Sequence, residues 1–222
     1  MSSGSQISKA MTADLMISSF VLEFGYFEEF VLDHVFDAIA DRLIDPSVEG
    51  SHNWRVLLAL GQLNSQLALA IQAMWETHFR RWLRACAVEA HGDDREGANI
   101  KRLPIDRLDK HLLELRGVRL TDMPGGSALR ELVLVGNVVR HGDGPSAALL
   151  VATAQDIWRT APTIGEGTLS EENADKLIVS DARLKQYAEA VQQFWFASSR
   201  AVHATFEDPP WATEPSIGRS DS

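Results

Sequence analysis

Cysteine is almost absent from this chain. The 222 residues include a single one, Cys86, which excludes an intramolecular disulfide and a metal site built from cysteines alone. Such cysteine usage is typical of a reducing compartment, so we expect the protein in the cytoplasm. The first eight residues also lack the basic stretch and apolar core of a signal peptide.

Long apolar runs and an excess of positive charge are missing too. Charged or amide side chains interrupt every apolar stretch well before the roughly 20 residues that a membrane span needs, so we expect no membrane segment. Asp and Glu number 31 against 21 Lys and Arg, and the formal net charge is −10. This charge excludes binding of nucleic acid by bulk electrostatics, although a local basic site remains compatible with it.

The chain has enough apolar residues, 45%, to form a real core. We expect a single domain over residues 1–207, with two small domains as the alternative. Residues 208–222 hold three prolines among Ser, Gly and charged residues, and they predict a disordered tail.

Helical spacing of apolar residues and the lack of strand alternation predict an all-α helical bundle. Two long N-terminal helices are expected, over 12–45 with a bend or close contact at Gly25 and an end at Pro46, and over 54–90 with Ser51 or Asn53 as N-cap. Further helices are expected over 105–116, 128–140, 147–157 and 182–204, with Gly117 as a C-cap and Ser127, Ser146 and Asp181 as N-caps. Residues 92–104 and 160–175 predict exposed loops, and 177–179 a short extended piece.

The most informative stretch is 129–144. On a helix that turns about 100° per residue, Arg130, Asn137 and His141 fall within one narrow stripe. His141 stands at the C-terminal end of this predicted helix, where an imidazole can reach a ligand and move protons, and Asp143 either orients it or makes the following turn with Gly144. The simpler interpretation is that Asn137 bonds a neighbouring helix and His141 caps its own.

This stretch resembles the signature of the HEPN superfamily, helical domains of bacterial toxin and defence systems that include many metal-independent ribonucleases. The family signature is Arg, a polar residue that is often Asn, a few further residues, and His. Asn137 and His141 match it, whereas Gly136 stands at the position of the Arg. In active members that Arg stabilises the phosphate and the His acts in proton transfer, so the resemblance implies His141 and Asn137 as catalytic residues.

The resemblance also implies partners and chemistry. A HEPN-like protein is expected to form a homodimer whose two motifs share one cleft, to act on RNA without a metal or other cofactor, and to belong to a defence, toxin-antitoxin or stress system with a partner protein. The alternative is a non-catalytic helical module that binds a partner protein or RNA. A helical domain unrelated to this superfamily is the third interpretation.

Other arginines are candidates for the missing guanidinium. Arg140 points about 100° away from His141, and Arg130 lies about 16 Å down the helix axis, so neither is a simple replacement. A basic cluster in the second helix, supported by Glu76, offers another source of phosphate contacts. The simpler interpretation is an ion pair between Glu76 and Arg80, four positions apart, beside aromatic side chains of the core. The members of this cluster are Arg80, Arg81 and Arg84.

No metal site is expected from the remaining sequence. The histidines show no spacing with carboxylates that is typical of metal ligands, and HExxH is absent. His34 lies near Asp33 and Asp37, which an exposed helix face explains. The glycines match neither a P-loop nor a dinucleotide-binding loop.

Overall fold

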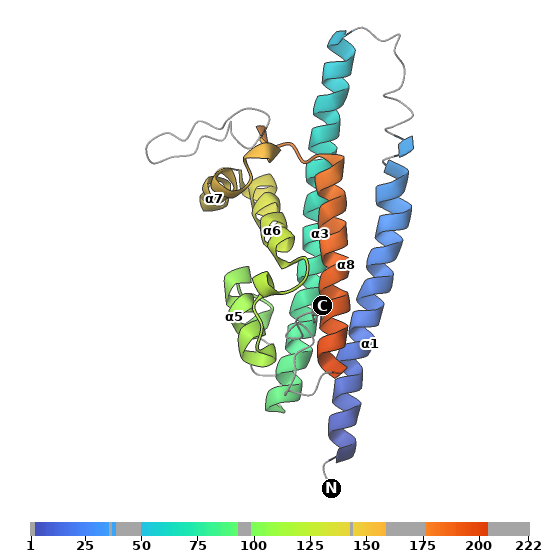
Figure 1. Ribbon diagram of the computed structural model, residues 1–222, viewed down its shortest axis with the longest axis vertical. Helices are drawn as coiled ribbons and strands as arrows, with labels where there is room; N and C mark the ends of the chain where they lie inside the picture. The colour runs from blue at the N-terminus through green and yellow to red at the C-terminus, as the bar shows by residue number, and fades with distance from the viewer. Residues whose placement is uncertain are drawn as a thin grey trace, which may run out of the picture.

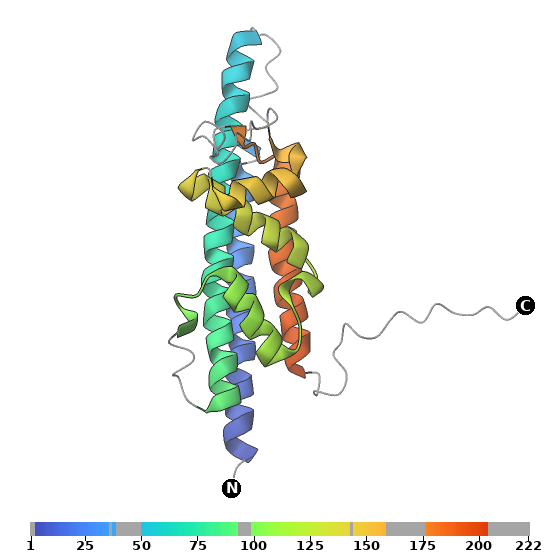
Figure 2. The ribbon, with the colours of Figure 1, turned by 90° about the vertical axis from the view of Figure 1, so that its left-hand side faces the viewer.

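A computed structural model describes residues 3–35, 37–38, 50–92, 99–142, 144–158 and 176–203. Long helices dominate it: α1 (Ser3–Phe27), α3 (Gly50–His91) and α8 (Asp181–His203) run side by side along the molecule (Figure 1). The shorter helices α5 (Ile105–Arg116), α6 (Gly126–His141) and α7 (Pro145–Thr153) cover one side of α3 (Figures 1 and 2). The outer side of α1 carries none of these helices (Figure 1).

The prediction of an all-α helical bundle with two long N-terminal helices is confirmed. Among the described residues the only strand-like pairing is one antiparallel bridge between Trp158 and Leu177, at the predicted extended piece. The short 3-10 turn η2 (Leu120–Asp122) links α5 to α6, and a second one, η3 (Gln155–Ile157), follows α7. No helix in the described part is long and apolar enough to cross a membrane.

An aromatic cluster joins α3 and α8. Trp75 and Phe79 of α3 stack with their ring centroids 5.3 Å apart, and both meet Phe194 of α8 edge-on at 5.8 Å and 5.4 Å. Trp82 packs against Trp195 at 6.0 Å. All five side chains are almost fully buried, so the aromatics of α3 belong to the core, as the simpler interpretation had it.

The first two helices start earlier than predicted. Helix α1 begins at Ser3 rather than residue 12, and α3 begins at Gly50, so Ser51 and Asn53 lie inside the helix and are not its N-cap. Each residue added to a helix gains one backbone hydrogen bond, and nothing in these two N-terminal extensions prevents the helix from continuing. The end of α3 at His91 is confirmed, with Gly92 at φ +76°. Residues 39–49, with Pro46, and the predicted tail 208–222 lie outside the described residues.

Helix α1 changes form after Gly25 without the predicted close contact. A Cβ built on Gly25 would meet no atom within 4 Å. The irregularity begins three residues later as a π turn, η1 (Glu28–Asp33). The exposed loop predicted over 92–104 is wrong at Ile100, which is helical and fully buried. The loop 160–175 lies outside the described part of the chain.

Several predicted caps are replaced by others. Helix α6 begins at Gly126 after Gly125 at φ +74°, so Ser127 is not its N-cap. A Cβ on Gly125 would lie 2.5 Å from the Ala190 oxygen of α8, which explains why glycine is needed there. The short helix predicted to Ile157 ends at Thr153. The backbone N–H of Arg183 bonds the Ser180 hydroxyl at 3.2 Å, so Ser180 rather than Asp181 caps α8.

The predicted C-cap is confirmed. Gly117 adopts φ +70° after α5, and its N–H bonds the Leu113 carbonyl at 2.9 Å. A left-handed residue at this position satisfies carbonyls that the helix end leaves open. It also turns the chain toward the N-terminus of α6, the helix that carries the candidate site.

Candidate functional site at the C-terminal end of α6

Helix α6 presents Asn137 and His141 at its C-terminal end. Leu129, Leu132 and Val135 on its other side are fully buried in the core. Asn137 is half-buried, and His141, the last residue of the helix, is exposed. Within the described residues the His141 ring has no hydrogen-bond or ion-pair partner. This imidazole is therefore open to a ligand.

The side chain of Asn137 bonds a neighbouring helix. Its Nδ2 donates to the Ser146 hydroxyl at 3.2 Å, which links α6 to the first turn of α7. Ser146 was expected to cap this helix, but it lies inside it and the cap position is Gly144. The interpretation of Asn137 as a link between helices is thus confirmed, while the predicted capping role of Ser146 is wrong.

Gly136 is packed against α3. A Cβ at this position would lie 2.5 Å from Oε1 and 3.0 Å from Cδ of Gln72. Gln72 is fully buried, and both its polar atoms are hydrogen-bonded, so it cannot move aside without losing those bonds. The close approach of α3 therefore excludes a larger residue at 136 as long as Gln72 keeps its place.

Arg140 brings a guanidinium to the same helix end by another route. Its side chain lies back along α6, where Nε donates to the Gly136 carbonyl at 3.2 Å and Nη2 to Oδ1 of Asn137 at 3.4 Å. The same Nη2 donates to Gln72 Oε1 at 2.7 Å. The positive charge beside Asn137 therefore comes from Arg140 and not from the residue at position 136, which is a glycine.

The hydrogen bonds continue from Gln72 along α3. Gln72 Nε2 donates to Glu76 Oε2 at 2.6 Å, and the other Glu76 oxygen pairs with Arg80. Arg80 in turn donates to the carbonyls of Leu103 at 2.6 Å and Ile100 at 3.0 Å. The i, i+4 ion pair of the simpler interpretation is present. Since backbone carbonyls also bind it, Arg80 serves the packing of α3 on the segment before α5.

The remaining candidate arginines point elsewhere. Arg130 pairs with two carboxylates of α5, at 3.2 Å from Asp106 and 3.6 Å from Asp109. Arg81 is exposed and its charge acts on His78, which faces α1. Arg84 is half-buried on α3, and Asp143 lies outside the described residues. Of the cations expected at the site, the structure brings Arg140 next to Asn137.

Gln72 and Ser146 belong to this site but were not among the residues predicted for it. Gln72, Glu76 and Arg80 follow one another at intervals of four residues, a polar row on one face of α3 that could have indicated a contact with another helix. Ser146 had no comparable signal, because its role depends on how α7 folds back onto α6.

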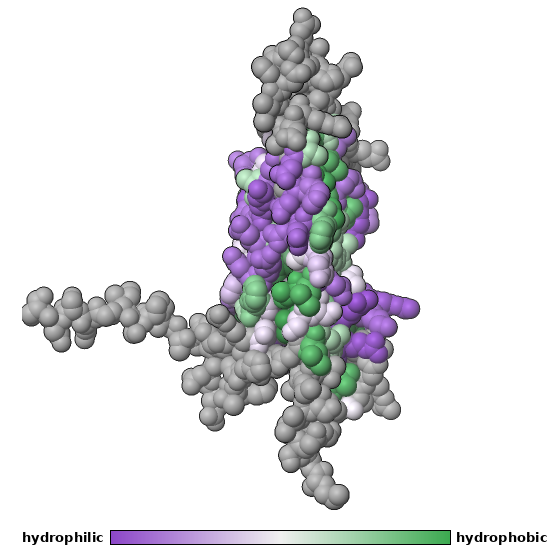
Figure 3. Space-filling model, turned by 90° about the vertical axis from the view of Figure 1, so that its right-hand side faces the viewer, coloured by the Kyte–Doolittle hydropathy of each residue, from purple (hydrophilic) through white to green (hydrophobic). Residues whose placement is uncertain are grey.

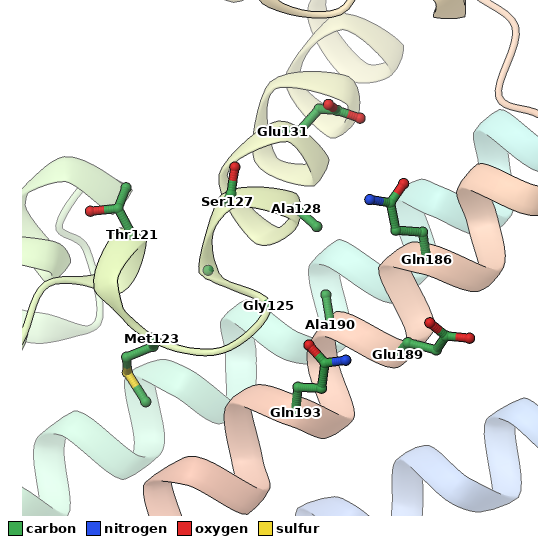
Figure 4. Close-up of a pocket in the computed structure, with 11 residues that line it drawn as sticks. Thr121, Met123, Gly125, Ser127, Ala128, Glu131, Gln186, Glu189, Ala190 and Gln193 are labelled. Atoms are coloured by element: carbon green, nitrogen blue, oxygen red, sulfur yellow. The ribbon is translucent and has the colours of Figure 1, made fainter. Parts of the chain in front are cut away.

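Two hollows lie beside α6. One, of about 370 Å³, is next to its C-terminal end and is lined by Gln62 and Gln66 of α3, Val139 and Gly142 among others. The other, of about 420 Å³, lies at the opposite end between the first turn of α6 and α8 (Figure 4). There Glu131 already accepts from the Tyr187 hydroxyl at 2.6 Å and pairs with Arg183 at 3.2 Å.

The structure offers no metal cluster and no reactive thiol in its described part. No three His, Cys, Asp or Glu side chains lie together there in a way that could hold a metal ion. Cys86 is buried, and burial raises the pKa of its thiol to about 12, which keeps it protonated and unreactive.

No family model matches this sequence, and searches of curated proteins and of solved structures found no match.

Proposed function

We propose that this chain is a HEPN-like protein of a bacterial defence, toxin-antitoxin or stress system that acts on RNA at the C-terminal end of α6. The observation that carries the proposal is the exposed His141 directly after Arg140, whose guanidinium is held beside Asn137 at 3.4 Å. An imidazole for proton transfer and a cation for a phosphate are the groups that metal-independent RNA cleavage needs. The single buried Cys86 favours a cytoplasmic location.

The proposed reaction is an internal transesterification. The ribose 2′-oxygen attacks the adjacent phosphorus, the bond from phosphorus to the 5′-oxygen breaks, and a 2′,3′-cyclic phosphate forms. A base takes the proton of the 2′-hydroxyl and an acid gives one to the leaving 5′-oxygen. Each chain places one histidine at this helix end, so a homodimer with two facing motifs supplies both. Arg140 stabilises the charge on the phosphate oxygens.

The test is cleavage of a mixed RNA pool in EDTA by the purified protein and its His141→Ala variant, with 3′ ends analysed for cyclic phosphate. We expect the variant to lose activity by about a hundredfold or more, the usual contribution of a general acid or base. His111→Ala is the matched control, because His111 lies on α5 and pairs with Glu114 at 3.4 Å. Equal activity of the His141→Ala variant would refute the role of His141.

A second candidate is a non-catalytic module that binds RNA or a partner protein. It is favoured by the internal use of the polar groups, since Arg140 donates to both Asn137 and Gln72. Position 136 also carries a glycine packed against Gln72 and not an arginine. This module would be supported, and the nuclease rejected, by a folded wild-type dimer that cleaves no RNA but still binds RNA or a protein. That binding should not depend on His141.

A further inference from the structure

The outer face of α1 carries a row of exposed apolar side chains. Leu15, Leu22 and Tyr26 are 62%, 63% and 60% exposed, and Phe30 in the π turn is 58% exposed. At about 100° per residue, the first three lie within about 40° of one another and opposite the buried Phe24. Helix α1 is therefore apolar on two opposite faces, a pattern that soluble surface helices avoid unless both faces have partners. Hydrophobic side chains are visible along this side of the molecule (Figure 3).

The aromatic members of this row contact one another. The ring centroids of Tyr26 and Phe30 are 6.0 Å apart, and those of Phe30 and His34 are 6.3 Å apart. The π turn η1 lies in the same stretch, and single π turns occur often at functional sites. Aromatic side chains are also enriched at protein interfaces. We call the face made by Leu15, Leu22, Tyr26 and Phe30 the α1 outer face.

Along residues 15–38, the charged side chains have one sign. Residues 15–38 contain no Lys or Arg. Three exposed carboxylates accompany the apolar row, on Glu29, Asp33 and Asp37, whereas Glu23 bonds His78 of α3. A ligand for this face needs apolar side chains and positive flanks.

A second copy of the chain does not meet these requirements. Packing two α1 outer faces together would bring their carboxylates into one interface. The chain after His203 is likewise excluded by charge, because it holds four carboxylates and one Arg.

We propose that the α1 outer face docks a basic amphipathic helix of a partner protein. The partner lays its apolar stripe on Leu22, Tyr26 and Phe30, and its Lys and Arg side chains pair with the carboxylates beside them. This mode is helix-on-helix recognition with anchors at intervals of three and four residues. It does not depend on RNA cleavage at α6.

The test uses a synthetic helical peptide of Leu, Lys and Arg with one apolar face, and a second peptide in which Glu replaces Lys and Arg. We expect the full-length protein to bind the basic peptide, more weakly at high salt, and not the acidic one. The double variant Leu22→Gln/Phe30→Gln should lose about tenfold or more in affinity, and Glu29→Gln/Asp33→Asn a few-fold. Leu149→Gln, at a 50% exposed leucine of α7, is the matched control and should bind like wild type.

Three outcomes would overturn the proposal. One is equal affinity of the wild type and the Leu22→Gln/Phe30→Gln variant for the basic peptide, with folding of both verified by circular dichroism. Another is preference for the acidic peptide. The third is a wild-type dimer, measured by analytical ultracentrifugation, that this double variant makes monomeric, since a second copy would then occupy the α1 outer face.

Discussion

The interface of α3 with α8 and the interface of α3 with α6 hold the same helix by different means. Toward α8, α3 uses aromatic rings such as Trp75, which pack in the core. Toward α6 it uses a polar chain in which Gln72 bonds Arg140 and fits against Gly136. Apolar burial depends on area and tolerates small shifts, whereas a buried hydrogen-bond chain depends on each partner. The second interface is therefore the more specific one, and it lies beside the candidate site.

The largest loss of stability is expected from a substitution in the apolar interface of α3 with α8. Trp75→Ala should lower the free energy of unfolding by about 3–5 kcal/mol, because it leaves a cavity against Phe79 and Phe194. Urea denaturation followed by circular dichroism measures this loss. Phe196→Ala, at a 57% exposed position of α8, serves as control with a change within about 0.5 kcal/mol. A similar loss for both variants would mean that the cluster is not the core of the bundle.

The polar interface should respond to changes at Gly136 in a partner-dependent way. Gly136→Ala should destabilise the protein by about 1–3 kcal/mol, since the new Cβ displaces Gln72 from its bonds. In a Gln72→Ala background the same change should stabilise by up to about 1 kcal/mol through helix propensity. A double-mutant cycle measures this reversal of sign. Additive effects would show that Gln72 does not occupy the space beside Gly136.

A pH-dependent effect is expected where α1 meets α3. His78 stacks on Phe20 at 4.1 Å and bonds Glu23 at 3.0 Å. Burial lowers the pKa of His78 below its ordinary value of 6.5, although Glu23 opposes the shift. The folded state therefore binds a proton less readily than the unfolded one, so the contribution of His78 is present above about pH 6.5 and is lost as the pH falls.

The variant His78→Gln isolates this contribution. Denaturation curves between neutral and mildly acidic pH should show the wild type losing stability faster than the variant. Subtracting the variant's curve from that of the wild type cancels the effect of Glu28. Burial raises the pKa of Glu28, so its contribution to stability changes with pH in the opposite direction to that of His78. Parallel pH profiles of the two proteins would contradict the assignment.

The smallest effect is expected at a helix cap. Ser180→Ala should cost about 1 kcal/mol, because the N–H of Arg183 loses its hydroxyl partner at the start of α8. Ser127→Ala, a change at the serine that sequence pattern favours as a cap but that lies within α6, should cost almost nothing. Thermal unfolding of the two variants compares them directly, and equal losses would place a cap at Ser127 as well.

Sequence pattern predicted the helices well and their contacts poorly. The apolar side of α8 is readable from helical spacing, and its residues Leu184, Tyr187 and Phe194 are buried. The start of α6 does not, because Gly125 is required by the backbone of Ala190, which lies far away in sequence. Helix periodicity says which face is apolar, but not which residues of two helices meet.

The candidate site shows the same limit. The pattern placed Asn137 and His141 together at one helix end, and their helix is as expected. It did not predict that Arg140 folds back to Gly136 and Asn137, because a long side chain reaches around a helix only where its neighbours offer acceptors. Arg80 and Arg130, by contrast, are held by carboxylates and carbonyls of their surroundings. Sequence spacing alone does not distinguish these environments.

The most direct test of the proposed site compares two arginines of α6 in the RNA cleavage assay with EDTA. Arg140→Ala removes the cation beside Asn137, whereas Arg130→Ala removes one that binds α5. We expect the Arg140→Ala variant to lose cleavage by about tenfold or more and the Arg130→Ala variant to stay within about twofold of wild type. Equal rates for the two variants, or no cleavage by the folded wild-type protein, would contradict the proposal that the end of α6 is a ribonuclease site.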